Sequence, residues 1–272
     1  MLTQAEKGRI FRALHQREGV FVIPNPWDAG SARLLAQMGF EALATTSAGF
    51  AFSLGKPDGA VGRDAMMAHV AAIAAAVDLP VSGDLENGYG DAPEQAAQTI
   101  LLAAAAGLVG ASIEDTTGRP EEPIYEINLA IERVAAAAEA AHALQFPFTL
   151  TARCENFLHG HPNLDDTILR LRAYQEAGAD VLYAPGLKNM DEIAAVIHAV
   201  DRPVNVLAAE DFNVTALAEL GVRRISVGSA LARAALTGFL NAAREMRERG
   251  TFTFAGSSVS YGELNQRFRP FA

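Results

Sequence analysis

Acidic side chains gather where several apolar segments of this sequence end. Residues 81–91, VSGDLENGYGD, begin as an apolar run and then carry Asp84 and Glu86 two positions apart. Glu114 follows a second apolar run, and Arg153 follows a third. Carboxylates brought together repel one another unless a cation joins them, so the pattern indicates a divalent metal site with one guanidinium beside it. Oxygen ligands without histidine or cysteine favour Mg²⁺, with Mn²⁺ as the other choice.

A second interpretation applies to each of these residues taken alone. An acidic residue after a strand is often a helix N-cap or a solvated loop residue. Asp28 and Asp115 are the clearest candidates for that structural role. The site is favoured for Asp84, Glu86 and Glu114 because these residues follow consecutive apolar runs and would meet at one edge of a parallel sheet.

The elements that must position these side chains alternate along the chain. Apolar, strand-like runs alternate with longer amphipathic or alanine-rich segments that read as helices. Eight such units in 272 residues predict an α/β fold, a (β/α)8 TIM-type barrel, and no G-x-G-x-x-G motif follows the first run. The predicted strands are 20–24, 42–46, 79–84, 109–115, 146–153, 180–185, 203–208 and 223–228.

Active sites of such barrels lie at the carboxyl ends of the strands, so residues there are candidates for binding. Trp27 follows the first strand, and Asn205 lies in the seventh; both are predicted to contact a substrate. Residues 45–49 follow the second strand and end in Ser47, Ala48 and Gly49.

The chain reads as one domain, residues 1–272, with an additional helix in its first 18 residues. Residues 229–248 predict a long final helix, and the whole of 229–272 forms a C-terminal helical extension beyond the eighth unit. Its aromatic residues need a surface to cover, which the residues alone place either on this barrel or on a partner subunit.

Composition excludes several classes of partner. The formal net charge is −10, from 22 basic and 32 acidic side chains, which argues against nucleic acid and anionic membranes as partners. No apolar run reaches the ~18 residues that a membrane span needs, and the N-terminus lacks the apolar core of a signal peptide. With a single cysteine, Cys154, the chain is expected to be a cytoplasmic protein.

Four motifs in order resemble the isocitrate lyase/phosphoenolpyruvate mutase superfamily. They are NPWDAGSARLLAQMGFEALATTSAGFA, DLENGYGD, SIED and TARCENF, and the resemblance covers about residues 20–185. It implies a Mg²⁺ site that binds a 2-oxo acid or its enolate, and chemistry on the neighbouring C–C or P–C bond. It also implies a homotetramer, or a dimer, with C-terminal helices exchanged between subunits.

Carried over by position, the resemblance implies Asp84 as the direct metal ligand, with Glu86 and Glu114 binding the metal through water. It implies Arg153, Glu114 and Asp58 as catalytic residues, and Arg153 as the contact for the substrate or its enolate oxygen. The substrate carboxylate would lie against the loop of Ser47, Ala48 and Gly49.

The segment after the fourth strand departs from the superfamily pattern. Lyases carry a Lys-Lys/Arg-Cys-Gly-His run there, and phosphonate-forming mutases carry Lys and Asn, whereas this chain reads EDTTGRPEEPIYE. Loss of a general acid typically costs ~10²–10⁴-fold in rate, which argues against classical isocitrate lyase activity. Gly186 also stands where lyases tend to have Glu.

These observations predict a Mg²⁺-dependent carbon–carbon lyase or decarboxylase that acts on an isocitrate-, methylisocitrate- or oxaloacetate-like acid and stabilises its enolate. Two other interpretations stay open: a non-catalytic 2-oxo acid-binding protein, and a phosphonate mutase or hydrolase. Arg119, in the divergent segment, would meet a second substrate carboxylate if that segment closed over the site.

Overall fold

Eight parallel strands form the centre of the molecule, as the sequence predicts. The computed structural model describes residues 1–269. Each observed strand falls within one predicted strand segment. The strands are β1 (Phe21–Ile23), β2 (Leu43–Ala44), β3 (Val81–Asp84), β4 (Gly110–Glu114), β5 (Thr149–Arg153), β6 (Val181–Tyr183), β7 (Val204–Leu207) and β8 (Arg224–Ser226).

The sheet runs β1-β8-β7-β6-β5-β4-β3-β2, every pair parallel, so the strands wrap into a nearly closed (β/α)8 barrel. The two ends of this order, β1 and β2, meet through one main-chain hydrogen bond, from the Ala44 N–H to the Pro24 carbonyl at 3.1 Å. The Asn25 side chain adds to this closure. Its amide nitrogen donates to the Thr45 carbonyl at 2.9 Å, and its oxygen accepts from the N–H groups of Val227 and Gly228.

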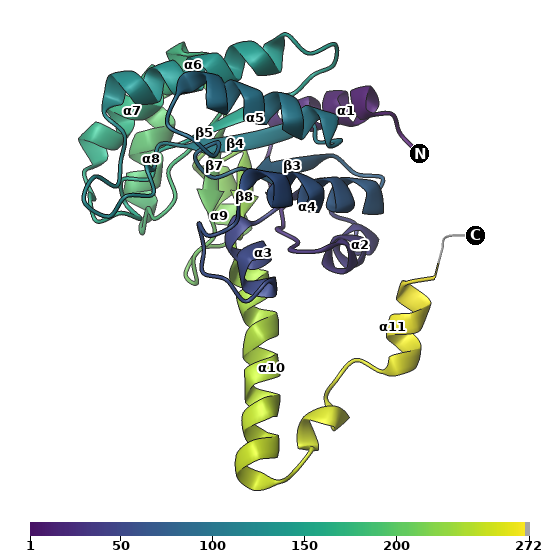
Figure 1. The fold of residues 1–272 in the computed structure, drawn as a ribbon. Coiled ribbons are helices and arrows are strands. Elements are labelled where there is room, and N and C mark those ends of the chain that lie inside the picture. The colour runs from purple at the N-terminus through teal and green to yellow at the C-terminus, as the bar shows by residue number, and fades with distance from the viewer. Residues whose placement is uncertain (270–272) are drawn as a thin grey trace.

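Helices surround the strands (Figure 1). Their bounds are α1 (Gln4–Gln16), α2 (Ala29–Gln37), α3 (Ser47–Ser53), α4 (Arg63–Ala76), α5 (Pro93–Ala105), α6 (Ile127–His142), α7 (Leu164–Glu176), α8 (Met190–Ala199), α9 (Val214–Glu219), α10 (Ala230–Arg249) and α11 (Tyr261–Arg267), with a 3₁₀ turn η1 (Thr253–Gly256). No helix within residues 1–269 has both the length and the apolar character required to cross a membrane.

The additional N-terminal helix is confirmed as α1, and it closes the amino-terminal end of the barrel. Thr3 and Glu6 form a capping box that fixes where α1 starts. Phe11 and Leu14 of α1 are buried in a small cluster with Phe21 and Ile23 of β1. The end of the barrel opposite to the predicted site is therefore sealed by apolar packing.

The predicted final helix is confirmed as α10. Figure 1 shows α10 leaving the barrel as an isolated rod, with η1 and α11 beyond it. Leu236, Phe239 and Leu240 on α10 are 39%, 68% and 48% exposed. The chain then returns toward α2, where Arg33 donates to the Phe268 carbonyl at 3.0 Å.

Candidate active site

Arg153 lies at the carboxyl end of β5 and joins carboxylates from three different segments. Its guanidinium is 2.9 Å from an Asp84 oxygen of β3, 3.1 Å from Glu114 of β4 and 2.8 Å from Glu155. The register pairs Glu114 with Arg153 across β4 and β5, which explains the contact between them. The side chain of Arg153 is only 14% exposed, so these charge-assisted contacts form away from bulk water.

Asp84 is fixed on its other side by the segment after β2. Its second carboxylate oxygen accepts from the backbone N–H and the hydroxyl of Ser47, both at 3.0 Å. The Asp84 N–H donates to the Thr45 hydroxyl at 2.9 Å. Asp58 lies beyond Ser47, with 3.3 Å between the Ser47 hydroxyl and the Asp58 carboxylate. Ser47 and Arg153 together determine the orientation of Asp84.

The loop after β3 holds an unusual backbone conformation. Glu86 and Tyr89 have φ values of 49° and 61°, in the left-handed region that side chains other than glycine rarely adopt. Arg133, a buried residue of α6, donates to the carbonyls of Asn87, Gly90 and Asp91 in this loop. That clamp holds the backbone of the strained loop that carries Glu86.

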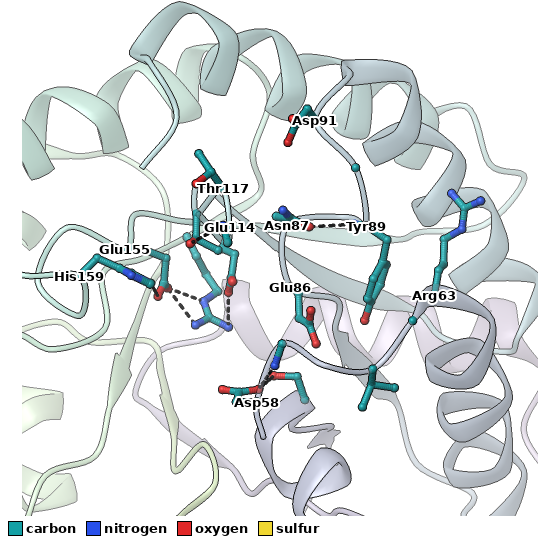
Figure 2. Close-up of a pocket in the computed structure, with 18 of the residues that line it drawn as sticks. Asp58, Arg63, Glu86, Asn87, Tyr89, Asp91, Glu114, Thr117, Glu155 and His159 are labelled. Atoms are coloured by element: carbon teal, nitrogen blue, oxygen red, sulfur yellow. Dashed lines mark hydrogen bonds and ion pairs between the residues drawn. The ribbon is translucent and has the colours of Figure 1, made fainter. Parts of the chain in front are cut away.

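A cavity of about 1110 Å³ opens above these residues. Figure 2 shows Glu86, Glu114, Glu155 and Asp58 arranged around it, with Tyr89 and Arg63 on one side and His159 on the other. A second cavity of about 180 Å³ extends into the barrel beneath Arg153. Ser47, Asp58 and Arg153 line both cavities.

Negative charge exceeds positive charge in the upper cavity, and the pKa values show its effect. Burial, followed by the nearby carboxylates of Asp84 and Asp58, raises the pKa of Glu86 to about 7. Burial raises the pKa of Glu114 well above its usual range, although Arg153 opposes this. Partial desolvation and then Asp84 raise the pKa of Asp58. Each shift means that the ionised carboxylate lacks a sufficient counter-charge.

The donor set suits a hard divalent cation bound largely through water. Asp58, Asp84, Glu86 and Glu114 supply only carboxylate oxygens. A cation would favour the ionised forms of Asp58, Glu86 and Glu114, whose pKa values are raised. Within residues 1–269, no three histidine, cysteine or acidic side chains converge closely enough to bind one ion directly. Mg²⁺ tolerates this arrangement because it commonly keeps several water ligands.

The segment after β4 supplies no acid to the cavity. Thr116 and Thr117 line it, and Thr116 pairs with Ile124 in an isolated antiparallel bridge. Arg119 points to another partner: its guanidinium is 2.8 Å from Asp91. Asp91 also accepts from the Tyr125 hydroxyl at 2.6 Å. Arg119 is therefore engaged at the rim of the cavity in this conformation.

The residues proposed from the sequence fall into three groups. Six lie together at the mouth of the barrel, the end where the carboxyl ends of the strands meet: Ser47, Asp58, Asp84, Glu86, Glu114 and Arg153. Ala48 and Asn205 line the inner cavity, but the Asn205 amide is already bonded to Ser226 and Arg224. Trp27 and Gly49 are outside the residues that line either cavity.

Gly49 has a packing role that the sequence did not suggest. Its N–H donates to the Thr46 hydroxyl at 3.2 Å, which caps α3. A Cβ at this position would approach the Thr46 methyl at 2.6 Å and the Trp27 Cβ at 3.0 Å. Trp27 and Gly49 therefore pack against each other beside the site. Asp28 is confirmed as an N-cap, since it accepts from the Ser31 N–H at 2.6 Å.

Arg63, Tyr89 and His159 are among the residues that line the upper cavity and that the sequence did not suggest. The Tyr89 hydroxyl is buried and has no hydrogen-bond partner among the described residues. His159 lies 3.8 Å from the Glu155 carboxylate, although a histidine in a polar loop usually indicates surface. The only signal for Tyr89 is its place within the DLENGYGD motif.

The fold and the mouth define a (β/α)8 barrel with a carboxylate-rich site where barrels of this kind carry their active sites. The family model described as phosphoenolpyruvate phosphomutase matches residues 11–247. The chain belongs to this family, which confirms the resemblance to the isocitrate lyase/phosphoenolpyruvate mutase superfamily.

Individual relatives agree with this placement. A solved structure of a candidate lyase/mutase from Burkholderia cenocepacia J2315 is 61% identical, with a TM-score of 0.96, and covers 98% of this chain and 97% of that one. The oxaloacetate decarboxylase of Ectopseudomonas mendocina (strain ymp) is 29% identical over 87% of this chain and 83% of its own. The 2-methylisocitrate lyase of Escherichia coli (strain K12) is also 29% identical, over 72% and 68%.

Proposed function

We propose that this protein is a Mg²⁺-dependent enzyme that binds a small 2-oxo acid or a related di- or tricarboxylate and stabilises its enolate while a carbon–carbon bond breaks. The observation that carries this proposal is the position of Arg153, held between Asp84 and Glu114 at the base of a carboxylate-lined cavity. A guanidinium fixed there can stabilise negative charge that develops on the substrate without reorganising first. Mn²⁺ is the other metal that this donor set suits.

Asp84 would hold the metal directly, and Glu86 and Glu114 would hold it through water. When bound, Mg²⁺ would supply Lewis-acid polarisation of the 2-oxo group. The chain's own contribution is orientation: Ser47 and Arg153 fix the Asp84 carboxylate, and Arg133 holds the backbone of the loop that carries Glu86. Asp58, at 3.3 Å from the Ser47 hydroxyl, is placed to accept a proton at the open side of the cavity.

The β4–α6 segment favours decarboxylation over cleavage of the isocitrate type. Cleavage of isocitrate needs a proton donor for the departing carbanion, and residues 115–126 offer no cysteine, histidine or lysine. In decarboxylation of an oxaloacetate-like acid, the bond to the departing carboxylate breaks and CO₂ leaves. The electron pair forms the enolate of a 2-oxo acid, and water then protonates its carbon. The oxaloacetate decarboxylase and 2-methylisocitrate lyase among the relatives support this range of substrates.

The first experiment tests ligand binding separately from chemistry. Metal-free protein is unfolded thermally with Mg²⁺, with oxalate as an unreactive 2-oxo acid mimic, and with both. We expect the largest rise in melting temperature with both together. Asp84→Ala should abolish the rise, whereas Asp78→Ala, an exposed aspartate at the other end of β3, should keep it. An unchanged wild-type melting temperature under all conditions would contradict the proposal.

The second experiment tests turnover. Oxaloacetate and 2-methylisocitrate both yield pyruvate on cleavage, so one pyruvate assay covers the two substrates. The rate with Mg²⁺ alone must be subtracted, because oxaloacetate also decarboxylates without enzyme. Binding without turnover would identify a 2-oxo acid-binding protein instead. Turnover of phosphonopyruvate in place of both acids would identify a phosphonate enzyme.

We also propose that the protein is cytoplasmic and that it assembles as a homotetramer, or a dimer. Its subunits would exchange their C-terminal helices. Its support is the exposed apolar face of α10, led by Phe239 at 68% exposure, which no described residue covers. Light scattering should report an oligomer for the wild type and a smaller species for Phe239→Glu. A monomeric wild type at micromolar concentration would contradict this part of the proposal.

A further inference from the structure

A second buried arginine lies deeper in the barrel. Arg224, in β8, is 5% exposed. Its guanidinium donates to the Asn205 side-chain oxygen at 2.9 Å and to the Thr151 hydroxyl at 3.0 Å, and it lies 3.3 Å from the His15 Nε2. These contacts use three of the five N–H donors of an arginine.

None of the partners of Arg224 carries a negative charge. Asn205 and Thr151 are neutral, and His15 is neutral as well. His15 Nδ1–H donates to the Phe11 carbonyl at 2.8 Å, which leaves Nε2 as the acceptor facing the guanidinium. Burial, followed by the charge of Arg224, lowers the pKa of His15 to about 3.

Arg224 thus has no carboxylate partner. The ion pairs formed by residues 1–269 do not include it. Burial lowers the pKa of Arg224 to about 10, a shift in the direction expected when a cation lacks a counter-charge. An isolated charge is costly in a protein interior unless an opposite charge accompanies it.

Arg224 faces a cavity with room for such a charge. The inner cavity of about 180 Å³ is lined around Arg224 by the hydroxyl-bearing residues Thr45, Ser82, Ser112 and Ser226. Asp58 and Asp84 also line it, on the side of Arg153, and Arg153 pairs with Asp84. One water molecule needs only about 10–15 Å³ of such space. Hydroxyl groups can rotate to donate toward an anion, so the lining is suited to a small negatively charged group.

The cavity also connects to the site at the mouth. Arg153, Tyr183, Asn205 and Arg224 occupy successive paired positions across β5, β6, β7 and β8. Arg153 lies over the Tyr183 ring at 5.2 Å from its centroid, and both line the inner cavity with Arg224. A row of polar side chains therefore leads from the mouth of the barrel to Arg224 and its partners, which form the floor of the inner cavity.

We propose that the barrel interior beneath Arg153 is a binding site for one small anion of single negative charge, held by Arg224 and the surrounding hydroxyl groups. The anion is either a free halide-sized ion or one carboxylate arm of an acid that enters from the mouth. The site is independent of the proposed reaction, because it rests on the charge of Arg224 and the shape of the inner cavity.

The direct test is anomalous diffraction from wild-type crystals soaked in bromide. We expect a bromide peak within hydrogen-bond distance of the Arg224 guanidinium. A second soak contains bromide with oxalate and Mg²⁺. Retention of bromide at Arg224 identifies a free ion as the occupant. Its replacement there by a carboxylate group identifies the acid, and both results support the site. Only uncharged solvent at Arg224 in both soaks would overturn the proposal.

A matched variant tests the charge argument in solution. Asn205→Asp keeps the shape of the side chain and places a carboxylate about where the amide oxygen now lies, 2.9 Å from Arg224. Wild-type protein should show a saturable rise in melting temperature, by about 2 °C or more, with sodium bromide against sodium sulfate at equal ionic strength, because sulfate carries two charges. Asn205→Asp should lose this rise and the bromide peak, whether or not the enzyme turns over oxaloacetate. An identical response of both proteins to bromide would count against Arg224 as the anion ligand.

Discussion

Arg153 and Arg224 lie in the same barrel, at positions linked through paired residues of four adjacent strands, yet their surroundings differ in charge. Arg153 contacts three carboxylates, whereas the partners of Arg224 are an amide, a hydroxyl and a neutral imidazole. Burial alone would lower both pKa values. The carboxylates around Arg153 outweigh burial and raise its pKa well above the usual range, but nothing comparable acts on Arg224.

The difference shows that burial of a charge does not by itself indicate what the protein does with it. At the mouth, an excess of carboxylates makes the site receptive to a cation. At the floor, an unpaired guanidinium makes the interior receptive to an anion. The two proposed sites therefore have opposite charge preferences within one barrel, and each can be tested by changing its charge.

Replacement of Arg153 should have the largest effect. Arg153→Met would leave Asp84, Glu114 and Glu155 without their shared cation. Loss of one partner of a buried ion pair typically costs ~3–5 kcal/mol, and we expect a loss of this size in Mg²⁺-free denaturant unfolding. Turnover should fall ~10²–10³-fold, since an electrostatic stabiliser would be missing. Arg202→Met, on the exposed surface, is the control and should match wild type.

Metal addition should have the next largest effect, and only at the mouth. Mg²⁺ at about 100 times its dissociation constant should raise the free energy of unfolding by ~2.7 kcal/mol. Sodium salts at the same ionic strength provide the control. Asp84→Asn should remove the increase, while Arg224→Gln should preserve it. A metal response that depended on Arg224 would break the separation of the two sites.

Acidification should lower stability in part through His15, beside Arg224. His15 has a pKa near 6.5 when unfolded and about 3 when folded, so the unfolded chain binds the extra proton as the pH falls. Its contribution to stability is complete above pH 6.5 and is lost between 6.5 and about 3. We expect a loss of ~1.5–2 kcal/mol between pH 6.5 and about 5.

The comparison of two histidine variants checks this. His15→Gln, which does not titrate, should remove that part of the pH dependence, whereas His198→Gln on the exposed face of α8 should leave it unchanged. Parallel pH profiles for wild type and His15→Gln would show that His15 is not the neutral partner of Arg224.

A carboxylate added beside Arg224 should have the smallest effect on the free energy of unfolding, and it should increase stability rather than reduce it. In halide-free buffer, Asn205→Asp should raise the free energy of unfolding by about 1 kcal/mol, since it gives Arg224 a charge-assisted hydrogen bond. Urea unfolding would measure the change. Thr151→Val, which removes a neutral partner of Arg224, should instead lower stability. A destabilised Asn205→Asp protein would mean that Arg224 is already compensated.

The sequence predicts the strands and the mouth far better than it predicts the floor. Apolar runs locate all eight strands, and the rule that parallel strands end at one edge brings Asp84, Glu114 and Arg153 together. Arg224 was not predicted as a site residue, because it follows Arg223 and only the strand register decides which of the two arginines faces inward. A shift of one residue would exchange their positions.

Trp27 and Gly49 were predicted to contact the substrate but do not line either cavity, and the reason is different. Both follow strands at the correct end of the barrel, but their packing against each other depends on how α3 starts at Thr46. Position along a strand can be inferred from periodicity. Whether a loop side chain turns toward a cavity or toward its neighbour depends on contacts that are distant in the sequence.

Asn25 has a consequence for how the molecule opens. Its side chain takes the role that main-chain groups perform elsewhere in the barrel, since it bonds the segment after β2 and the segment after β8 at once. Amide protons at Ala44, Val227 and Gly228 therefore share one local opening event and should exchange with solvent as a group. The same event would uncover the inner cavity beside β1. An ion would then have a second route to Arg224 besides the mouth, and its rate of exchange would depend on this local opening as well.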